Sequence, residues 1–189
     1  RMAFQSGVGV APIYMVDEGI SDLFHVDLGI AIVIVGLIIF PVGFLLDRHS
    51  VGLTTVLTTL ILGPMMALML PLLPPVPESY PARFAYMLLG LVINAAGIAV
   101  YLYPDRGGSC LEIIMLCISR RTGLAIGTAR VLSDVLWFAI GWVLGGTWGW
   151  GTLASLLLTG PLLQFWVRVL RPILSRFYKR PVPRELSQV

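Results

Sequence analysis

Four long stretches without a charged residue dominate the sequence, at positions 28–46, 51–77, 84–104 and 135–167. A helix of about 20 apolar residues spans the hydrocarbon core of a bilayer, and each stretch is close to that length or longer. Charged residues make up only 12% of the 189 residues, about half the share found in an ordinary soluble domain. The sequence therefore predicts an all-α polytopic membrane protein, and it excludes a disordered chain and an ordinary cytosolic enzyme.

The stretch at 135–167 is too long for one crossing, because a helix of that length would measure about 50 Å at about 1.5 Å per residue. Glycines and tryptophans coincide at 145–151, a composition typical of a helix break at the membrane surface. Five crossings and two short helical segments are then expected. The expected crossings are 28–46, 51–70, 83–103, 123–144 and 152–170, and the short segments are 12–24 and 110–119.

An internal repeat relates the two halves of the chain at an offset of 97 to 98 positions. An Ile-Ser pair at 20–21 aligns with the same pair at 118–119, and Gly-Pro at 63–64 aligns with Gly-Pro at 160–161. Each half reads as a glycine-rich loop, a short helix, a long helix and a helix with an internal Gly-Pro. We therefore expect two repeats, each with three spanning helices and one short re-entrant or interfacial helix.

Most of the helix at 83–103 has no counterpart in the first repeat, since only positions 1–5 precede the first glycine-rich loop. The first helix is thus expected to be largely missing from this chain, and the intact protein is expected to cross the membrane six times. The expected regions are a first repeat over 1–70, a proline-rich external loop over 71–82, a second repeat over 83–170 and a basic cytoplasmic tail over 171–189.

Charge distinguishes inverted repeats from parallel ones. If the short segments dip into the membrane without crossing it, each half has three crossings and the repeats are inverted. The acidic segment at 17–27 is then external, and Arg48 and the basic tail are cytoplasmic. If the short segments crossed the membrane, the repeats would be parallel and the acidic segment would lie inside. Because cytoplasmic flanks carry the excess of Lys and Arg, we expect inverted repeats and a cytoplasmic C terminus.

Several motifs are spread over nearly the whole chain. They are the glycine-rich segment 7–12 before Gly-Ile-Ser at 19–21, Arg-Arg-Thr-Gly at 120–123, Gly-Thr-Ala-Arg at 127–130, and the tryptophan- and glycine-rich run 141–152 followed by Gly-Pro at 160–161. This set resembles the YczE/YitT-type family of small bacterial integral membrane proteins. The resemblance implies a multi-pass protein of the bacterial plasma membrane. It implies no particular activity, since the family has no settled one.

The resemblance also directs attention to the two loops before the short helices. The family typically has Gly-Pro-aromatic-Asp in the first loop and Gly-Pro-Arg-Asp in the second. At the matching positions this chain has Ala-Pro-Ile-Tyr, which ends in Tyr14, and Ser-Cys-Leu-Glu, which ends in Glu112. The first copy has lost its carboxylate and the second has a glutamate, so that Tyr14 and Glu112 become candidate site residues.

Arg130 and Asp134 form the clearest local signal for a site. They lie four residues apart in one expected crossing, hence on one face of the helix and near the middle of the bilayer. Charges within a membrane are energetically costly and by default mark an ion or substrate pathway. The alternative is a neutralising pair that only fixes helix packing, and both interpretations stay open.

Two further features also have a purely structural alternative. Glu112 is an acid in a short segment, but Ser109 and Glu112 have the spacing of a capping box, in which they only cap a helix. The glycine-rich loops with Gly9, Gly107 and Gly108 lead into short helices, whose free amides can hold an anionic group. The glycines can equally serve only a tight reversal of the chain.

Asn94 lies near the middle of its expected helix and is a candidate for hydrogen bonding across helices. Neither a Ser/His dyad nor a metal-ligand spacing occurs, and Cys110 and Cys117 fit no zinc or redox motif. We therefore expect no enzyme activity, no metal and no cofactor. The candidate substrate-binding residues are Gly9, Tyr14, Asn94, Gly107, Gly108, Ser109, Glu112, Arg130 and Asp134.

Two functions remain open at this point. The first is a secondary-transporter-like or lipid-translocating protein with its pathway at the repeat interface, and with a small solute or an anionic lipid as substrate. The second is a non-transporting membrane subunit that stabilises or positions a partner enzyme or complex. The expected partners are membrane lipids and either another membrane protein or a second copy of the chain. Nucleic acid is not expected, because the basic residues gather beside an apolar segment at the C terminus.

Overall fold

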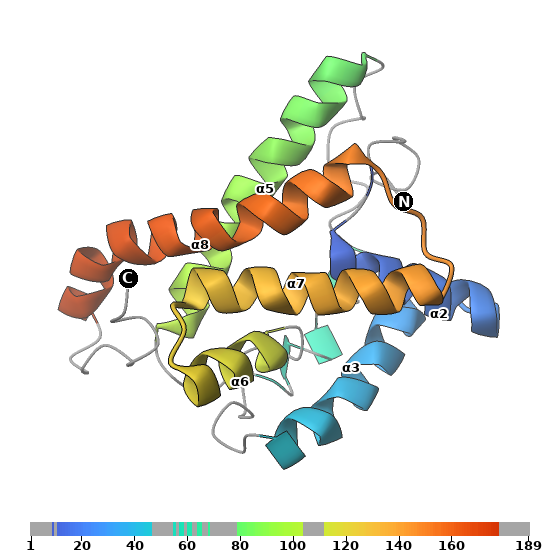
Figure 1. Cartoon of the computed structure of the whole chain (residues 1–189), viewed down its shortest axis with the longest axis horizontal. Helices are drawn as coiled ribbons and strands as arrows, with labels where there is room; N and C mark the ends of the chain where they lie inside the picture. Colours follow the sequence, from blue (N-terminus) through green and yellow to red (C-terminus); the bar gives the residue numbers. More distant parts are fainter. Residues whose placement is uncertain are drawn as a thin grey trace.

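The computed structural model describes residues 9, 11–46, 79–103 and 112–177, and also 55, 57, 58, 60, 61, 64, 65 and 68. Every named element in this part of the chain is a helix (Figure 1). Four of the helices are long and apolar enough to cross a membrane. The expectation of an all-α polytopic membrane protein is confirmed. The elements are α2 (Pro12–Phe24), α3 (Leu28–Leu46), α5 (Tyr80–Leu102), α6 (Ile113–Thr122), α7 (Ile126–Val143) and α8 (Trp150–Phe177).

The helix bounds of the first half agree with the sequence-based prediction, while those of the second half are shifted. α6 begins and ends three residues later than expected, and α7 begins three residues later, because Gly123 takes a left-handed φ of 69° and ends α6. α5 begins three residues early, since Pro81 is favourable in the first turn of a helix. α8 continues seven residues beyond Leu170, because its arginines are good helix formers. The expected crossing at 51–70 lies outside the described residues apart from the few given above.

α2 and α6 end with the same local structure. The residue after each helix has a left-handed backbone, with a φ of 53° at His25 and 69° at Gly123. The hydroxyl group of Ser21 donates to the carbonyl oxygen five residues later at 2.6 Å, and that of Ser119 does so at 2.8 Å. The aligned Ile-Ser pairs of the sequence are therefore helix stops, which turn the chain into α3 and α7.

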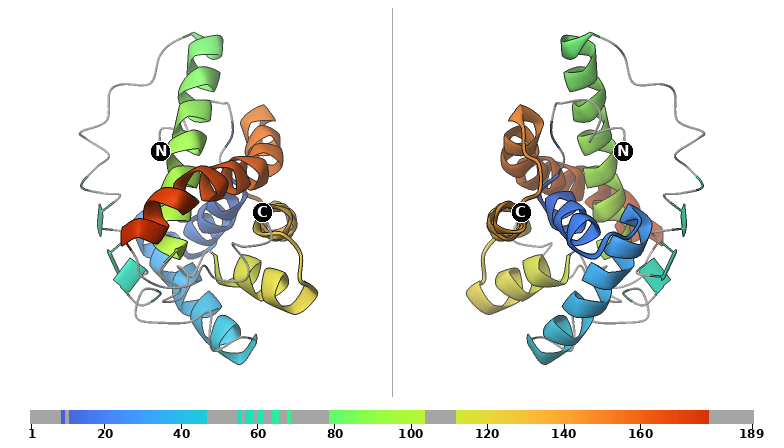
Figure 2. Two further views of the ribbon diagram at one scale, coloured as in Figure 1. Left: turned by 90° about the vertical axis from the view of Figure 1, so that its left-hand side faces the viewer. Right: turned by 90° about the vertical axis from the view of Figure 1, so that its right-hand side faces the viewer.

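The short helices begin near the centre of the structure and run toward opposite ends. In Figure 1, α2 and α7 run from left to right, whereas α3, α6 and α8 run from right to left. Figure 2 shows α7 end-on, with α8 on one side, α6 on the other and α2 beside it, in agreement with its contacts to all three. The chain thus turns back at the end of each short helix, from α2 into α3 and from α6 into α7, and α3 and α7 run in opposite senses.

Two apolar clusters hold these helices together. One joins α5, α6, α7 and α8 around residues such as Leu102, Met115 and Leu163, and the other joins α2, α3, α6 and α7 and includes Ile113 and Trp137. Large apolar side chains elsewhere on α3, α5, α7 and α8 are exposed, as expected of helices that face lipid. Helix association in a membrane then depends on close packing rather than on exclusion of water.

Glycines permit the closest of these helix contacts. Gly127 of α7 meets Gly160 of α8, Gly141 of α7 meets Met15 of α2, and Gly43 of α3 meets Ile113 of α6, each so closely that a Cβ atom at the glycine would collide. The glycine spacings of α7 therefore serve packing within the chain at Gly127 and Gly141.

We expect Gly141→Ala to destabilise the fold by about 1–3 kcal/mol, because overpacking forces backbone shifts. The new Cβ would lie 2.6 Å from the Cβ atom of Met15. Gly97→Ala on α5 is the matched control, since nothing lies within 4 Å of its Cβ position, and the better helix propensity of alanine should leave stability unchanged or raised. Thermal unfolding in detergent measures both. Equal stability of the two variants would show that α2 does not pack closely against α7 at Gly141.

Candidate functional site

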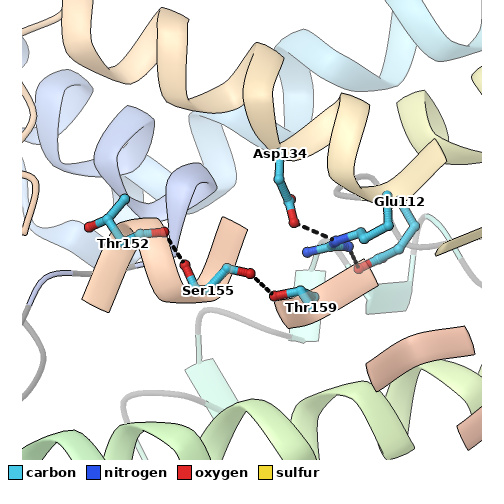
Figure 3. A network of polar contacts seen from close by, with 6 residues as sticks. Glu112, Asp134, Thr152, Ser155 and Thr159 are labelled. Atoms are coloured by element: carbon cyan, nitrogen blue, oxygen red, sulfur yellow. Dashed lines mark hydrogen bonds and ion pairs between the residues drawn. The ribbon is translucent and has the colours of Figure 1, made fainter. Parts of the chain in front are cut away.

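Three charged side chains meet in the interior between α6 and α7 (Figure 3). The Nε atom of Arg130 donates to Oδ2 of Asp134 at 3.1 Å, and its Nη1 atom donates to Oε1 of Glu112 at 3.3 Å. The three residues are 6%, 1% and 3% exposed. The predicted pair on one helix face is therefore found as an ion pair, and Glu112 joins it as a third member. We call these three residues the charged cluster.

The capping-box interpretation of Glu112 stays a prediction, because its partner Ser109 lies outside the described residues. In the described structure α6 begins at Ile113, and Glu112 is the residue that precedes it. Its carbonyl oxygen accepts the amide of Leu116 at 2.9 Å, while its carboxylate is held by Arg130. The sequence could not reveal this pairing, because the two residues are 18 positions apart and on different helices.

Tyr14 brings α2 within electrostatic reach of the charged cluster. It lies in the first turn of α2 and is half-buried. Burial raises the pKa of its hydroxyl group, the negative charges of Asp17 and Glu112 raise it further, and the positive charge of Arg130 lowers it. The starts of both short helices therefore lie within electrostatic reach of the same arginine.

A line of buried hydroxyl groups on α8 was not singled out from the sequence. Thr152, Ser155 and Thr159 are at most 3% exposed. Ser155 donates to the carbonyl oxygen of Thr152 at 2.8 Å, and Thr159 donates to that of Ser155 at 2.5 Å. Figure 3 shows the carboxylates of Asp134 and Glu112 directed toward the part of α8 that carries Ser155 and Thr159. The spacing of three and four residues in an otherwise apolar helix is the signal that could have identified this polar face.

The remaining predicted residues lie elsewhere. Gly9 has a φ of 103° and packs on the first turn of α8, where a Cβ atom would lie 2.6 Å from Oγ1 of Thr152. Asn94 is exposed on α5, and it is not among the described residues that pair with Arg130 in the charged cluster. Gly107, Gly108 and Ser109 lie outside the described residues.

Asp17 departs from the expectation of an external acidic segment at 17–27. It belongs to α2, is 1% exposed, and neither of its carboxylate oxygens has a hydrogen-bond partner in the described structure. Burial raises its pKa to about 7. The α2 helix has 13 residues, too few to span a membrane, and the side chain points into the fold and not toward an external loop.

The charges of the site do not balance. Glu112 and Asp134 supply two carboxylates, and Arg130 supplies one guanidinium group. Among the described residues, no group of three His, Cys, Asp or Glu side chains could hold a metal ion. The charged cluster therefore carries one excess negative charge when both acids are ionised.

Replacing Arg130 by Met should strand both carboxylates and cost about 3–5 kcal/mol of stability. The triple variant Glu112→Gln, Arg130→Met, Asp134→Asn removes every charge and should recover most of the loss, because a neutral replacement of a buried ion cluster is often tolerated. Arg168→Met, which removes an exposed arginine of α8, is the control and should change little. Unfolding in detergent provides the measurement. Loss of the same size in the triple variant would contradict the view that stranded charge is the cause.

Comparison with known proteins places the chain among uncharacterised membrane proteins. Residues 1–168 match the family described as "Family of unknown function (DUF6198)". An uncharacterized protein of Haemophilus influenzae is 25% identical over 165 residues, which cover 87% of this chain and 75% of the relative. The "Uncharacterized membrane protein YczE" of Bacillus subtilis is 23% identical over 158 residues, which cover 84% and 73%. No solved structure matches the chain.

Proposed function

The chain belongs to the DUF6198 family, a YczE-type family of membrane proteins of unknown function. From the site, we propose that it is a transporter-like protein of the bacterial plasma membrane, and that its pathway lies between two inverted repeats. One observation carries this proposal. The charged cluster is buried where the two short helices start, and Tyr14 and Glu112 reach Arg130 from these two starts. Discontinuous helices that begin at a central charged site are the common arrangement of secondary transporters.

Matched contacts in the two halves support the inverted repeat. At the offset of 98, Gly43 corresponds to Gly141 and Met15 corresponds to Ile113. Gly141 meets Met15, and Gly43 meets Ile113. The offset between the repeats thus converts the first contact into the second. A two-fold axis between two copies produces such reciprocal contacts. Since α3 and α7 run in opposite senses (Figure 1), this axis would lie in the plane of the membrane.

The hydroxyl-bearing helices repeat in the same way at the offset of 97. Thr55 and Thr152 are both 0% exposed. Thr58 donates to the carbonyl oxygen of Thr55 at 3.1 Å, as Ser155 does to that of Thr152 at 2.8 Å. Buried hydroxyl groups at these matching positions are suited to a hydrated path along the repeat interface.

The cost of the charged cluster favours a pathway over a packing device. Ionised groups within a membrane are expensive and are retained mainly where they serve ion or substrate movement. The positions that match Arg130 and Asp134 in the first repeat are Ile32 and Gly36, so the packing of a long central helix does not require the pair. The charges belong to one repeat, and rocking of one repeat against the other would expose them in turn.

Access of water to the pathway separates a transporter from a non-transporting subunit. In a variant without Cys110 and Cys117, Ser155→Cys should react with a small water-soluble thiol reagent in liposomes. Leu157→Cys on the exposed, lipid-facing side of α8 should not react, because a thiolate does not form in lipid. A folded protein with no reaction at position 155 would favour the alternative function, a non-transporting subunit that positions a partner. Such a subunit should co-purify with its partner in a fixed stoichiometry.

The orientation is tested in intact cells. Asp22, exposed at the end of α2, should be external, and Ser187 in the basic tail should be cytoplasmic, because positively charged flanks stay inside. In the same cysteine-free background, Asp22→Cys should react with an impermeant maleimide before lysis and Ser187→Cys only after it. The reverse pattern would overturn the assigned orientation.

A further inference from the structure

Asp17 is a buried acid that the charged cluster does not use. It lies on α2, one turn after Tyr14, and both of its carboxylate oxygens are enclosed without a hydrogen-bond donor among the described residues. An ionised carboxylate in this position is strongly disfavoured, since neither water nor a donor compensates its charge. The side chain is therefore suited to being neutral or to taking a positively charged ligand.

The surroundings of Asp17 connect it to the charged cluster. On α2 itself, the Tyr14 hydroxyl group responds to Asp17 on one side and to Glu112 and Arg130 on the other. α7, which packs against α2, carries Arg130 and Asp134. α6, which packs against α7, is preceded by Glu112.

The other elements packed against α2 contribute no charge at this depth. α3 has no titratable residue in its described span. α8 touches α2 only lightly and has its first arginine at position 168, beyond the buried hydroxyl groups. Tyr14 is thus the polar group that is affected by the charges of both Asp17 and the charged cluster.

The charge count identifies the class of ligand. Asp17, Glu112 and Asp134 are the buried acids of the described residues, and Arg130 is their one buried base, paired with Glu112 and Asp134. An anion would add to this excess in a medium of low dielectric constant, whereas a proton or another cation reduces it. The anionic group expected at the starts of the short helices is therefore not favoured by the charges that lie there.

We propose that Asp17 is a reversible proton-binding site and that its proton balances the excess negative charge of the Tyr14, Glu112, Arg130 and Asp134 site. The step is a simple proton transfer, in which a hydronium ion gives its proton to the carboxylate and a water molecule leaves. A cationic solute at the charged cluster repels this proton, so that the two ligands exclude each other, as proton–cation exchange requires. The exchange rests on the proposed function, whereas the proton binding does not.

The thermal midpoint in detergent, measured from about pH 5 to about pH 8, tests the proton site. The folded state holds the proton between the ordinary pKa of 3.8 and the raised pKa of about 7, and the unfolded state does not. Stability therefore falls as pH rises through this window and levels off above it. Asp17→Asn should have a higher midpoint than the unmodified protein, by a margin that grows from about pH 5 to about pH 8. Asp22→Asn, an exposed acid of the same helix, should keep the original pH dependence.

Infrared spectroscopy gives a second readout that does not depend on stability. The carbonyl band of a protonated carboxylic acid should be present at the low end of this pH range and lost at the high end. The band should be absent in Asp17→Asn and shifted in Asp17→Glu, which also serves if the asparagine variant does not fold. An unchanged band in Asp17→Glu, or equal pH dependence of Asp17→Asn and Asp22→Asn, overturns the proposal. The labelling of position 155 tests the transport pathway separately, so that either idea can fail alone.

Discussion

The two hydrogen-bonded ion pairs of Arg130 are the interaction on which the interior of this protein depends. A guanidinium group taken out of water needs hydrogen-bond acceptors, and here Asp134, one turn along α7, accepts from Nε and Glu112, before α6, accepts from Nη1. Because Glu112 precedes the first turn of α6, the position of this short helix is tied to a charge on a long one. The rotation of α7 about its own axis is thereby fixed as well.

Close backbone contacts make room for that arrangement. α2 and α6 cannot span a membrane, so each must be enclosed by long helices along its length. Gly141 and Gly43 allow Met15 and Ile113 to approach the helix backbone directly, and the Ser21 and Ser119 stops send the chain back at each end. Both features occur in both halves, and the two short helices begin near one another and end apart (Figure 1).

Much of the fold could be predicted from the sequence, and the site only in part. The bounds of α2 and α3 follow from Pro12 at a helix start and from an unbroken apolar stretch. Arg130 and Asp134 were identified because their spacing is local to one helix. The pairing of Glu112 with Arg130, the burial of Asp17 and the exposure of Asn94 were not predicted. Each depends on which helices are neighbours and on how they are rotated.

The sequence by itself determined that the chain is helical and crosses a membrane, since hydropathy and helix caps act over a few residues. It also indicated an internal repeat, which the matched contacts support and which stays a prediction. Only the tertiary structure decided that two acids pair with one buried arginine and that a third acid is buried without a partner among the described residues. The reason is physical: the charge of a side chain is set by its type, but its neighbours are set by helix crossing and rotation, which no local pattern encodes. An acid such as Asp17 therefore reads as an external charge in the sequence and becomes a buried, unpartnered carboxylate in the described fold.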